Sequence, residues 1–159
     1  MKNVRSLVQG ALIAAIYAVL TIAFAPISYG PVQVRVSEAL TILPFFTPAA
    51  IPGLFLGCII ANVYGMIIGI GPGIWDVVFG SLATLIAAYI SYKMPKKWLV
   101  PLPPVLVNAV VIGFMLNVLL KLPLLPTMLW VGVGEVAACY VIGYPLMLVL
   151  EKYKNRIFR

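Results

Sequence analysis

Long apolar runs, separated by short segments that contain glycine, proline or charge, make up most of this chain. Their boundaries predict six helices, over residues 5–25, 37–47, 48–69, 75–93, 101–120 and 126–150. A run of about 20 apolar residues is long enough to cross a hydrocarbon core of about 30 Å. The range 37–47 is shorter, because Thr47 and Pro48 form a pair that typically starts a new helix. The pattern predicts an all-α fold, that of a polytopic membrane protein with six transmembrane helices in a single transmembrane domain over residues 1–159.

The composition supports a membrane protein and excludes a water-soluble domain. Of the 159 residues, 64% are hydrophobic and 9% are charged, and the mean hydropathy is +1.12. A soluble domain typically carries about 25% charged residues, most of them at its surface. The two cysteines, Cys58 and Cys139, lie within predicted helices, and we interpret them as packing residues.

The positions of the basic residues predict the orientation, since positive charge is retained on the cytoplasmic side. With both termini cytoplasmic, Arg35 and Lys121 lie outside and nine basic residues lie inside: Lys2, Arg5, Lys93, Lys96, Lys97, Lys152, Lys154, Arg156 and Arg159. The net charge of +7 therefore reflects topology and contact with anionic lipid headgroups, and we expect no binding of nucleic acid.

Three of the four acidic residues, Glu38, Asp76 and Glu135, lie inside or at the edge of apolar runs. A charged side chain at the bilayer centre costs roughly 2.5 to 3.5 kcal/mol on insertion scales, so one that is retained usually faces a polar cavity or a partner. In the predicted topology all three lie in the outer half of the membrane. Asn117 and the loop that contains Tyr29, Gln33 and Arg35 lie on the same side. Together they predict an outward-facing ligand pocket among the helices, with that loop as its lid.

Each of these residues also has a purely structural interpretation. Ser37 is a candidate cap for the helix over residues 37–47, with Glu38 in the first turn complementing the helix dipole, and Asp76 is a candidate N-cap. Glu135 is a candidate for an ion pair with Arg35 or Lys121. Arg35 is equally compatible with a solvated loop, and Trp75 with the aromatic belt at the membrane interface. Asn108 and Asn117 are each candidates for a hydrogen bond to a neighbouring helix.

Three segments carry a resemblance to a known family. Residues 25–41 (APISYGPVQVRVSEALT), 44–48 (PFFTP) and 76–84 (DVVFGSLAT) resemble the QueT family of queuosine-precursor transporters, and the likeness extends over nearly the whole chain. Members of that family resemble the substrate-binding S-components of energy-coupling factor (ECF) transporters. The resemblance implies six helices, an outward-facing site with the first loop as lid, and a place in the prokaryotic cytoplasmic membrane.

The resemblance implies a 7-deazaguanine ligand such as preQ1, preQ0 or queuine. A carboxylate accepts two adjacent N–H donors of a guanine-like edge, and a second carboxylate holds an aminomethyl cation. We rank Glu38 and Glu135 ahead of Asp76 for these roles. The donors expected for the base carbonyl are Arg35, Gln33 and Asn117, and the expected stacking faces are Trp75, Trp130 and Tyr29.

Energy for transport must come from another protein, because the chain has no G-x-x-x-x-G-K-[ST] phosphate loop. Small residues recur in the first helix, with Ala11 and Ala15 on one stripe and Gly10, Ala14 and Ala18 on the next. Such stripes allow another helix to approach closely, either within this protein or in a partner. The resemblance implies that Ala11, Ala14 and Ala15 dock on a transmembrane scaffold subunit that carries two ATPases, and that the subunit topples in the membrane to release its substrate.

Other function classes remain open at this point. A stand-alone proton-coupled carrier also uses buried carboxylates, and an S-component for another vitamin or base has the same architecture. An intramembrane enzyme is disfavoured, because the chain has no histidine, no H-E-x-x-H or G-x-S-x-G motif, and one aspartate. We therefore expect no catalytic residue, no cofactor and no metal site.

Overall fold

The computed structural model describes residues 2–29 and 34–158, and those residues form helices and turns without a strand. The main elements are α1 (Lys2–Ala23), α3 (Ala50–Ile67), α4 (Ser81–Tyr92), α5 (Leu102–Leu120), α6 (Leu124–Val136) and α7 (Tyr144–Ile157). Shorter elements are α2 (Ala25–Ser28), the 3₁₀-helices η1 (Val36–Phe45) and η3 (Lys97–Leu99), and the π-helices η2 (Asp76–Gly80) and η4 (Ala137–Gly143). The all-α prediction is confirmed for the described part of the chain.

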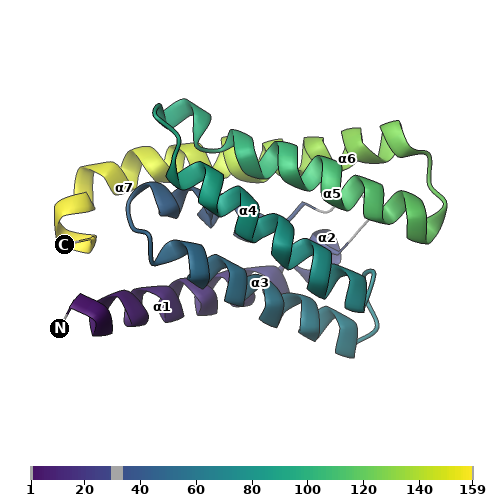
Figure 1. The fold of residues 1–159 in the computed structure, drawn as a ribbon, viewed down its shortest axis with the longest axis horizontal. Helices are drawn as coiled ribbons and strands as arrows, with labels where there is room; N and C mark the ends of the chain where they lie inside the picture. Colours follow the sequence, from purple (N-terminus) through teal and green to yellow (C-terminus); the bar gives the residue numbers. More distant parts are fainter. Residues whose placement is uncertain (1, 30–33, 159) are drawn as a thin grey trace.

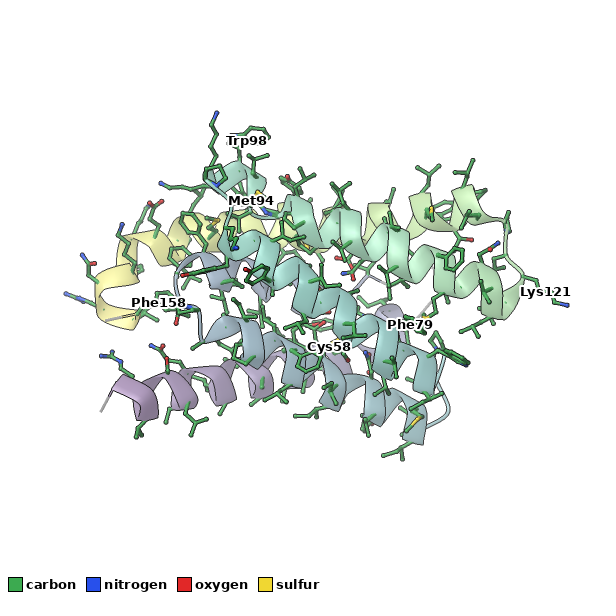
Figure 2. The ribbon with its side chains drawn as sticks, viewed as in Figure 1. Cys58, Phe79, Met94, Trp98, Lys121 and Phe158 are labelled. Atoms are coloured by element: carbon green, nitrogen blue, oxygen red, sulfur yellow. The ribbon has the colours of Figure 1, made fainter. Side chains whose placement is uncertain are left out.

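The long helices lie side by side in one bundle (Figure 1). Consecutive contacts run from α1 to α3, then to α4, α5 and α6. The segments α6, η4 and α7 form one continuous helix that returns along the bundle. Both chain ends lie at the same end of the molecule (Figure 1). Met94 and Trp98 lie in the same half, whereas Lys121 lies at the opposite end (Figure 2). The side of the membrane that each end faces remains a prediction.

Four helices in the described part of the chain are long and apolar enough to span a membrane: Val4–Ala23, Ala50–Ile67, Lys97–Leu120 and Leu124–Ile157. Two apolar helices, Val36–Phe45 and Asp76–Tyr92, are shorter. The ten residues of η1 extend about 20 Å as a 3₁₀-helix, less than the hydrocarbon core of about 30 Å. The count of six spans therefore remains a prediction, and four helices of the described part have the length and composition of membrane spans.

The segment η1 differs most from the predicted transmembrane helix over residues 37–47. It is a buried 3₁₀-helix, with every residue from Ser37 to Pro44 buried, and it packs against α1, α3, α4, α7 and η4. A 3₁₀-helix rises about 2.0 Å per residue against about 1.5 Å for an α-helix, so this short segment reaches further through the bundle. Its interior position carries Glu38 into the protein core.

Glycines allow α1 and α3 to approach closely. A Cβ atom on Gly53 would lie 2.6 Å from the Gly10 carbonyl oxygen, and one on Gly57 would lie 2.8 Å from the Ala14 carbonyl oxygen. The stripe formed by Gly10, Ala14 and Ala18 is buried in this contact. Ala14 is therefore a packing residue within this chain, contrary to its predicted place on a partner interface. Ala11 and Ala15 lie on the exposed face of α1.

Candidate ligand-binding site

A cluster of buried polar side chains lies among α1, η1, α3, η2, α4, α5, α6 and η4. We call it the polar cluster, and its members are Tyr17, Arg35, Glu38, Cys58, Asn62, Asp76, Thr84, Asn108, Glu135 and Cys139. The most exposed of them, Arg35 and Asn108, show 4% of their surface. Figure 2 places Cys58 near the middle of the bundle. The three acidic residues that lie in or beside apolar runs of the sequence, Glu38, Asp76 and Glu135, all belong to this cluster.

Arg35 and Asp76 form a buried ion pair between Arg35 Nη2 and Asp76 Oδ2. The guanidinium also donates from Nε to the Ser28 carbonyl oxygen at 3.4 Å, and its Cζ lies 5.7 Å from the centre of the Tyr29 ring. Because both side chains are removed from solvent, each charge requires the other. The solvated-loop interpretation of Arg35 is therefore wrong.

Asn62, on α3, contacts the first residue of η2. Its Nδ2 donates to the Asp76 backbone carbonyl oxygen at 2.8 Å. Two oxygens at this point, Asp76 Oδ1 and Asn62 Oδ1, are buried without a hydrogen-bond partner among the described residues. Asp76 makes no capping hydrogen bond to its helix, so the cap interpretation does not hold for its side chain. Unsatisfied buried acceptors are uncommon and often mark a place where a ligand or water donates.

Glu38 is held by two hydroxyl groups. Tyr17 Oη donates to Glu38 Oε1, and Thr84 Oγ1 donates to the same oxygen at 3.3 Å. Glu38 Oε2 is buried without a partner among the described residues. The neighbouring Ser37 hydroxyl bonds Thr21 Oγ1 at 2.7 Å, and η1 has no side-chain cap. The cap interpretation of this segment therefore fails, and Glu38 presents a free acceptor inside the protein.

Glu135 lies on α6 and bonds neutral groups. Asn108 Nδ2, on α5, donates to Glu135 Oε1 at 2.9 Å, and Cys139 Sγ lies 3.6 Å from Glu135 Oε2. The same sulfur lies 3.5 Å from the Glu38 backbone oxygen, so it joins the two glutamates within one network. Asn108 thus bonds a neighbouring helix, as one interpretation of the sequence proposed. The predicted ion pair of Glu135 is not formed with Arg35, which pairs with Asp76 instead.

Cys58 is a contact point for three members of the polar cluster. Its sulfur lies 3.3 Å from Asn62 Nδ2, 3.4 Å from Thr84 Oγ1 and 3.9 Å from Arg35 Nη1. The sequence pattern predicts packing roles for both cysteines and does not single out Tyr17, Asn62 or Thr84 as site residues. The available signal was a polar residue inside an apolar run, which is common in membrane helices because such residues bond neighbouring helices.

Several predicted site residues lie elsewhere. Asn117 Nδ2 donates to the Leu122 carbonyl oxygen at 2.5 Å, just beyond the end of its own helix. Trp130 is 59% exposed on α6. Tyr29 lies beside Arg35 and donates its hydroxyl to the Ala61 carbonyl oxygen. Gln33, with the rest of the predicted lid at residues 30–33, lies outside the described residues.

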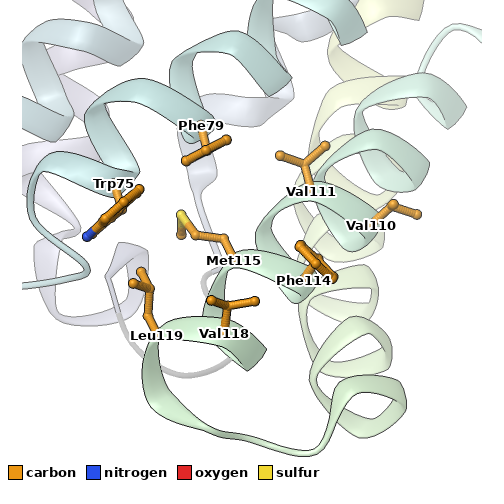
Figure 3. Close-up of a pocket in the computed structure, with 8 residues that line it drawn as sticks. All are labelled: Trp75, Phe79, Val110, Val111, Phe114, Met115, Val118 and Leu119. Carbon is orange, nitrogen blue, oxygen red and sulfur yellow. The ribbon is translucent and has the colours of Figure 1, made fainter.

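Trp75 lines an apolar groove and stacks on Phe79, with ring centres 6.0 Å apart. The groove has a volume of about 460 Å³ and lies between η2 and α5 (Figure 3). Its other lining residues are Val110, Val111, Phe114, Met115, Val118 and Leu119. No acidic side chain lines it, so this aromatic surface is separate from the buried carboxylates.

The two π-helices coincide with the acidic positions. Asp76 is the first residue of η2, and η4 begins two residues after Glu135 and contains Cys139. A π-helical turn holds an extra residue, which changes the direction of the side chains beyond it, and such turns are frequent at functional sites. Both segments therefore help to direct polar groups into the same interior region.

In the described part of the chain, one of the three carboxylates of the polar cluster is paired with a cation and the other two are not. Arg35 balances Asp76, whereas Glu38 and Glu135 bond only neutral groups in the described part of the chain. A site with free carboxylate and amide oxygens accepts hydrogen bonds and favours a ligand that is rich in N–H donors or carries positive charge.

Comparison with known proteins bears on what such a site binds. The sequence profile of a family described as QueT transporter matches residues 7–152. The queuosine precursor transporter QueT of Lactococcus lactis subsp. cremoris (strain MG1363) is 39% identical to this chain over 79 residues, which are 48% of this chain and 43% of that relative. The matched segment thus spans less than half of the relative's length. No solved structure matches the chain. Since the family profile covers nearly all of the sequence, the protein belongs to the QueT transporter family.

Proposed function

We propose that this protein is the membrane substrate-binding subunit, or S-component, of an ECF-type importer that takes up a queuosine precursor across the prokaryotic cytoplasmic membrane. The observation that carries the proposal is the polar cluster, in which Glu38 Oε2, Asp76 Oδ1 and Asn62 Oδ1 are buried without partners among the described residues. Burying such acceptors is unfavourable unless a donor satisfies them. A ligand with several N–H groups meets this need.

A 7-deazaguanine base has the required chemistry. Its guanine-like edge carries a carbonyl acceptor beside two adjacent N–H donors, and preQ1 adds an aminomethyl cation. Arg35 supplies donors, and Glu38, Asp76 and Glu135 supply acceptors within one buried network. A site that leaves its own polar groups unpaired with the wrong ligand discriminates strongly against analogues that lack a donor.

Transport in this proposal requires a scaffold subunit and two ATPases. The exposed face of α1 carries Ala11 and Ala15 between larger apolar residues, among them Leu7, Leu12 and Val19. Small residues at four-residue spacing allow two membrane helices to approach closely. This face is the surface that we assign to the scaffold, and the protein itself acts by binding and not by catalysis.

Uptake by reconstituted vesicles tests the proposal. The full chain is incorporated into vesicles alone, or together with an ECF scaffold and its ATPases. Uptake of labelled preQ1 is then followed with and without ATP on the side of the membrane that the ATPases face. We expect uptake only with the complete assembly and ATP. Uptake by the chain alone, driven by a proton gradient, would instead identify a stand-alone proton-coupled carrier. Uptake of another vitamin or base in place of preQ1 would identify an S-component with a different substrate.

A further inference from the structure

We propose that Asn62 contacts the ligand, and that Asp76 and Asn62 together bind the neutral edge of the base while Glu38 binds its cation. This inference rests on the proposed function, because it assigns the parts of a 7-deazaguanine ligand to individual residues. Three observations carry it: the orientation of the Asn62 amide, the close contact of Gly80 with the side chains of Asp76 and Asn62, and the distribution of charge in the polar cluster.

The orientation of the Asn62 amide follows from its partner. The atom that faces the Asp76 backbone carbonyl oxygen at 2.8 Å must be Nδ2, since a carbonyl oxygen only accepts hydrogen bonds. Asn62 Oδ1 therefore points away from that contact, and it is buried without a partner among the described residues. The side chain is 1% exposed, so water from the surface does not readily satisfy this oxygen.

Gly80 packs closely against the side chains of both Asp76 and Asn62. A Cβ atom on Gly80 would lie 2.9 Å from Asp76 Oδ1 and 3.0 Å from Asn62 Nδ2. The Asp76 carboxylate and the Asn62 amide thus both lie against one residue that has no side chain. Asp76 Oδ1 also has no partner in the described part of the chain. Two acceptor-bearing groups that lie next to each other suit two adjacent N–H donors.

The charge distribution separates the roles of the carboxylates. Asp76 is already paired with Arg35, so a neutral donor satisfies its second oxygen without leaving excess charge. Glu38 receives hydrogen bonds from the hydroxyls of Tyr17 and Thr84, which carry no charge. An ammonium group on the ligand would balance Glu38 in a buried setting where an unpaired ion is unfavourable.

The order of donors and acceptors matches the edge of the base. Arg35 donates to the Asp76 carboxylate, and Asn62 Nδ2 donates to the Asp76 backbone carbonyl oxygen, so the three residues follow one another in a chain of contacts. The Arg35 guanidinium is a donor, and the unpaired oxygens Asp76 Oδ1 and Asn62 Oδ1 are acceptors. The guanine-like edge has the complementary order of carbonyl, ring N–H and exocyclic amine. We assign the carbonyl to Arg35, the ring N–H to Asp76 Oδ1 and the exocyclic amine to Asn62 Oδ1.

The test is a titration of the full chain in detergent with three ligands: preQ1, its analogue without the exocyclic amine, and preQ0, in which a nitrile replaces the aminomethyl group. The wild type should bind the amine-free analogue more weakly than preQ1 by about tenfold or more. In Asn62→Leu, affinity for preQ1 should fall by a similar factor, and the difference between preQ1 and the amine-free analogue should disappear. In Glu38→Gln, the preference for preQ1 over preQ0 should disappear while the dependence on the amine remains.

Ser91→Ala is the matched control, because Ser91 is equally buried but donates only to the Val100 carbonyl oxygen, away from the polar cluster. It should discriminate among the three ligands as the wild type does. If Asn62→Leu binds preQ1 and still rejects the amine-free analogue, the assignment of Asn62 is wrong. If Asn62→Leu does not fold, equal wild-type affinity for preQ1 and the amine-free analogue still overturns the assignment. If the wild type binds none of the three ligands, the proposed function itself fails.

Discussion

Hydroxyl and amide groups, and not cations, surround two of the three buried carboxylates. Tyr17 and Thr84 donate to Glu38, and Asn108 donates to Glu135. Hydrogen bonds to a charged group typically contribute about 1.5 to 3 kcal/mol, which is less than the penalty for a fully buried unpaired ion. A bound cation or a shared proton would complete either site, and this need links the individual residues to ligand capture.

The glutamates are therefore expected to act in binding more than in folding. Glu38→Gln and Glu135→Gln should each weaken binding of preQ1 by about 10- to 100-fold, as expected for the loss of a charged hydrogen bond, while the protein still expresses and folds. Calorimetric titration gives the affinity, and thermal unfolding in detergent gives the stability. Normal binding by both variants would mean that these carboxylates are structural.

The Arg35–Asp76 pair should behave as a buried ion pair. Removing one partner, in Arg35→Gln or Asp76→Asn, leaves an uncompensated charge and should destabilise the protein by about 3 to 5 kcal/mol. The double variant removes both charges and should be less destabilised than the sum of the two single variants. Thermal unfolding of the four proteins measures this coupling, and strictly additive effects would show that the pair does not interact.

Charged site residues are visible in the sequence, whereas neutral ones are not. Glu38, Asp76 and Glu135 stand out because a carboxylate in an apolar run requires a partner. Tyr17, Asn62 and Thr84 do not, because hydroxyl and amide groups often join neighbouring membrane helices. The prediction of Asn117 depended on its depth in the membrane, and that of Trp130 on its aromatic ring alone. Depth does not specify which face of a helix points inward.

At the scale of the elements, contact between α1 and α3 depends on the absence of side chains. Gly57→Ala should destabilise the protein by about 1 to 3 kcal/mol, since the new Cβ would lie 2.8 Å from both the Ala14 carbonyl oxygen and Tyr17 Cβ. Gly132→Ala is the control, because its Cβ would meet Ala109 Cβ at an ordinary 3.6 Å. That change should be neutral or stabilising by up to about 1 kcal/mol. Equal thermal stability of the two variants would contradict the packing described here.

The long helices follow from apolar runs and breakers, but the irregular ones do not. The Gly69–Gly73 segment separates α3 from η2 as its glycines predict, with positive φ at Gly69, Gly71 and Gly73. The sequence pattern does not distinguish a buried 3₁₀-helix at residues 36–45 from a short α-helix, because every residue from Ser37 to Pro44 is buried and no exposed face marks the helical period. The π-helices also leave no hydrophobic period of their own, although they direct Asp76 and Cys139 inward.

For the whole molecule, the exposed face of α1 is the surface assigned to the scaffold. The double variant Ala11→Leu and Ala15→Leu should bind preQ1 as the wild type does, because both residues point away from the polar cluster. It should fail to co-purify with the scaffold and ATPases, since the larger side chains prevent close approach of a helix.

Val133→Leu with Val136→Leu on the exposed face of α6 is the matched control and should leave the assembly intact. Co-purification of the α1 double variant with the ATPases, at the level of this control, would show that the scaffold binds elsewhere.

The most direct test of the account is a calorimetric titration of the purified chain with preQ1, in the absence of any partner protein. A capture subunit with a preformed polar cluster should bind one equivalent tightly, and it should bind guanine, riboflavin and thiamine weakly or not at all. The absence of binding to preQ1, preQ0 and queuine alike would contradict the claim that this protein captures a queuosine precursor.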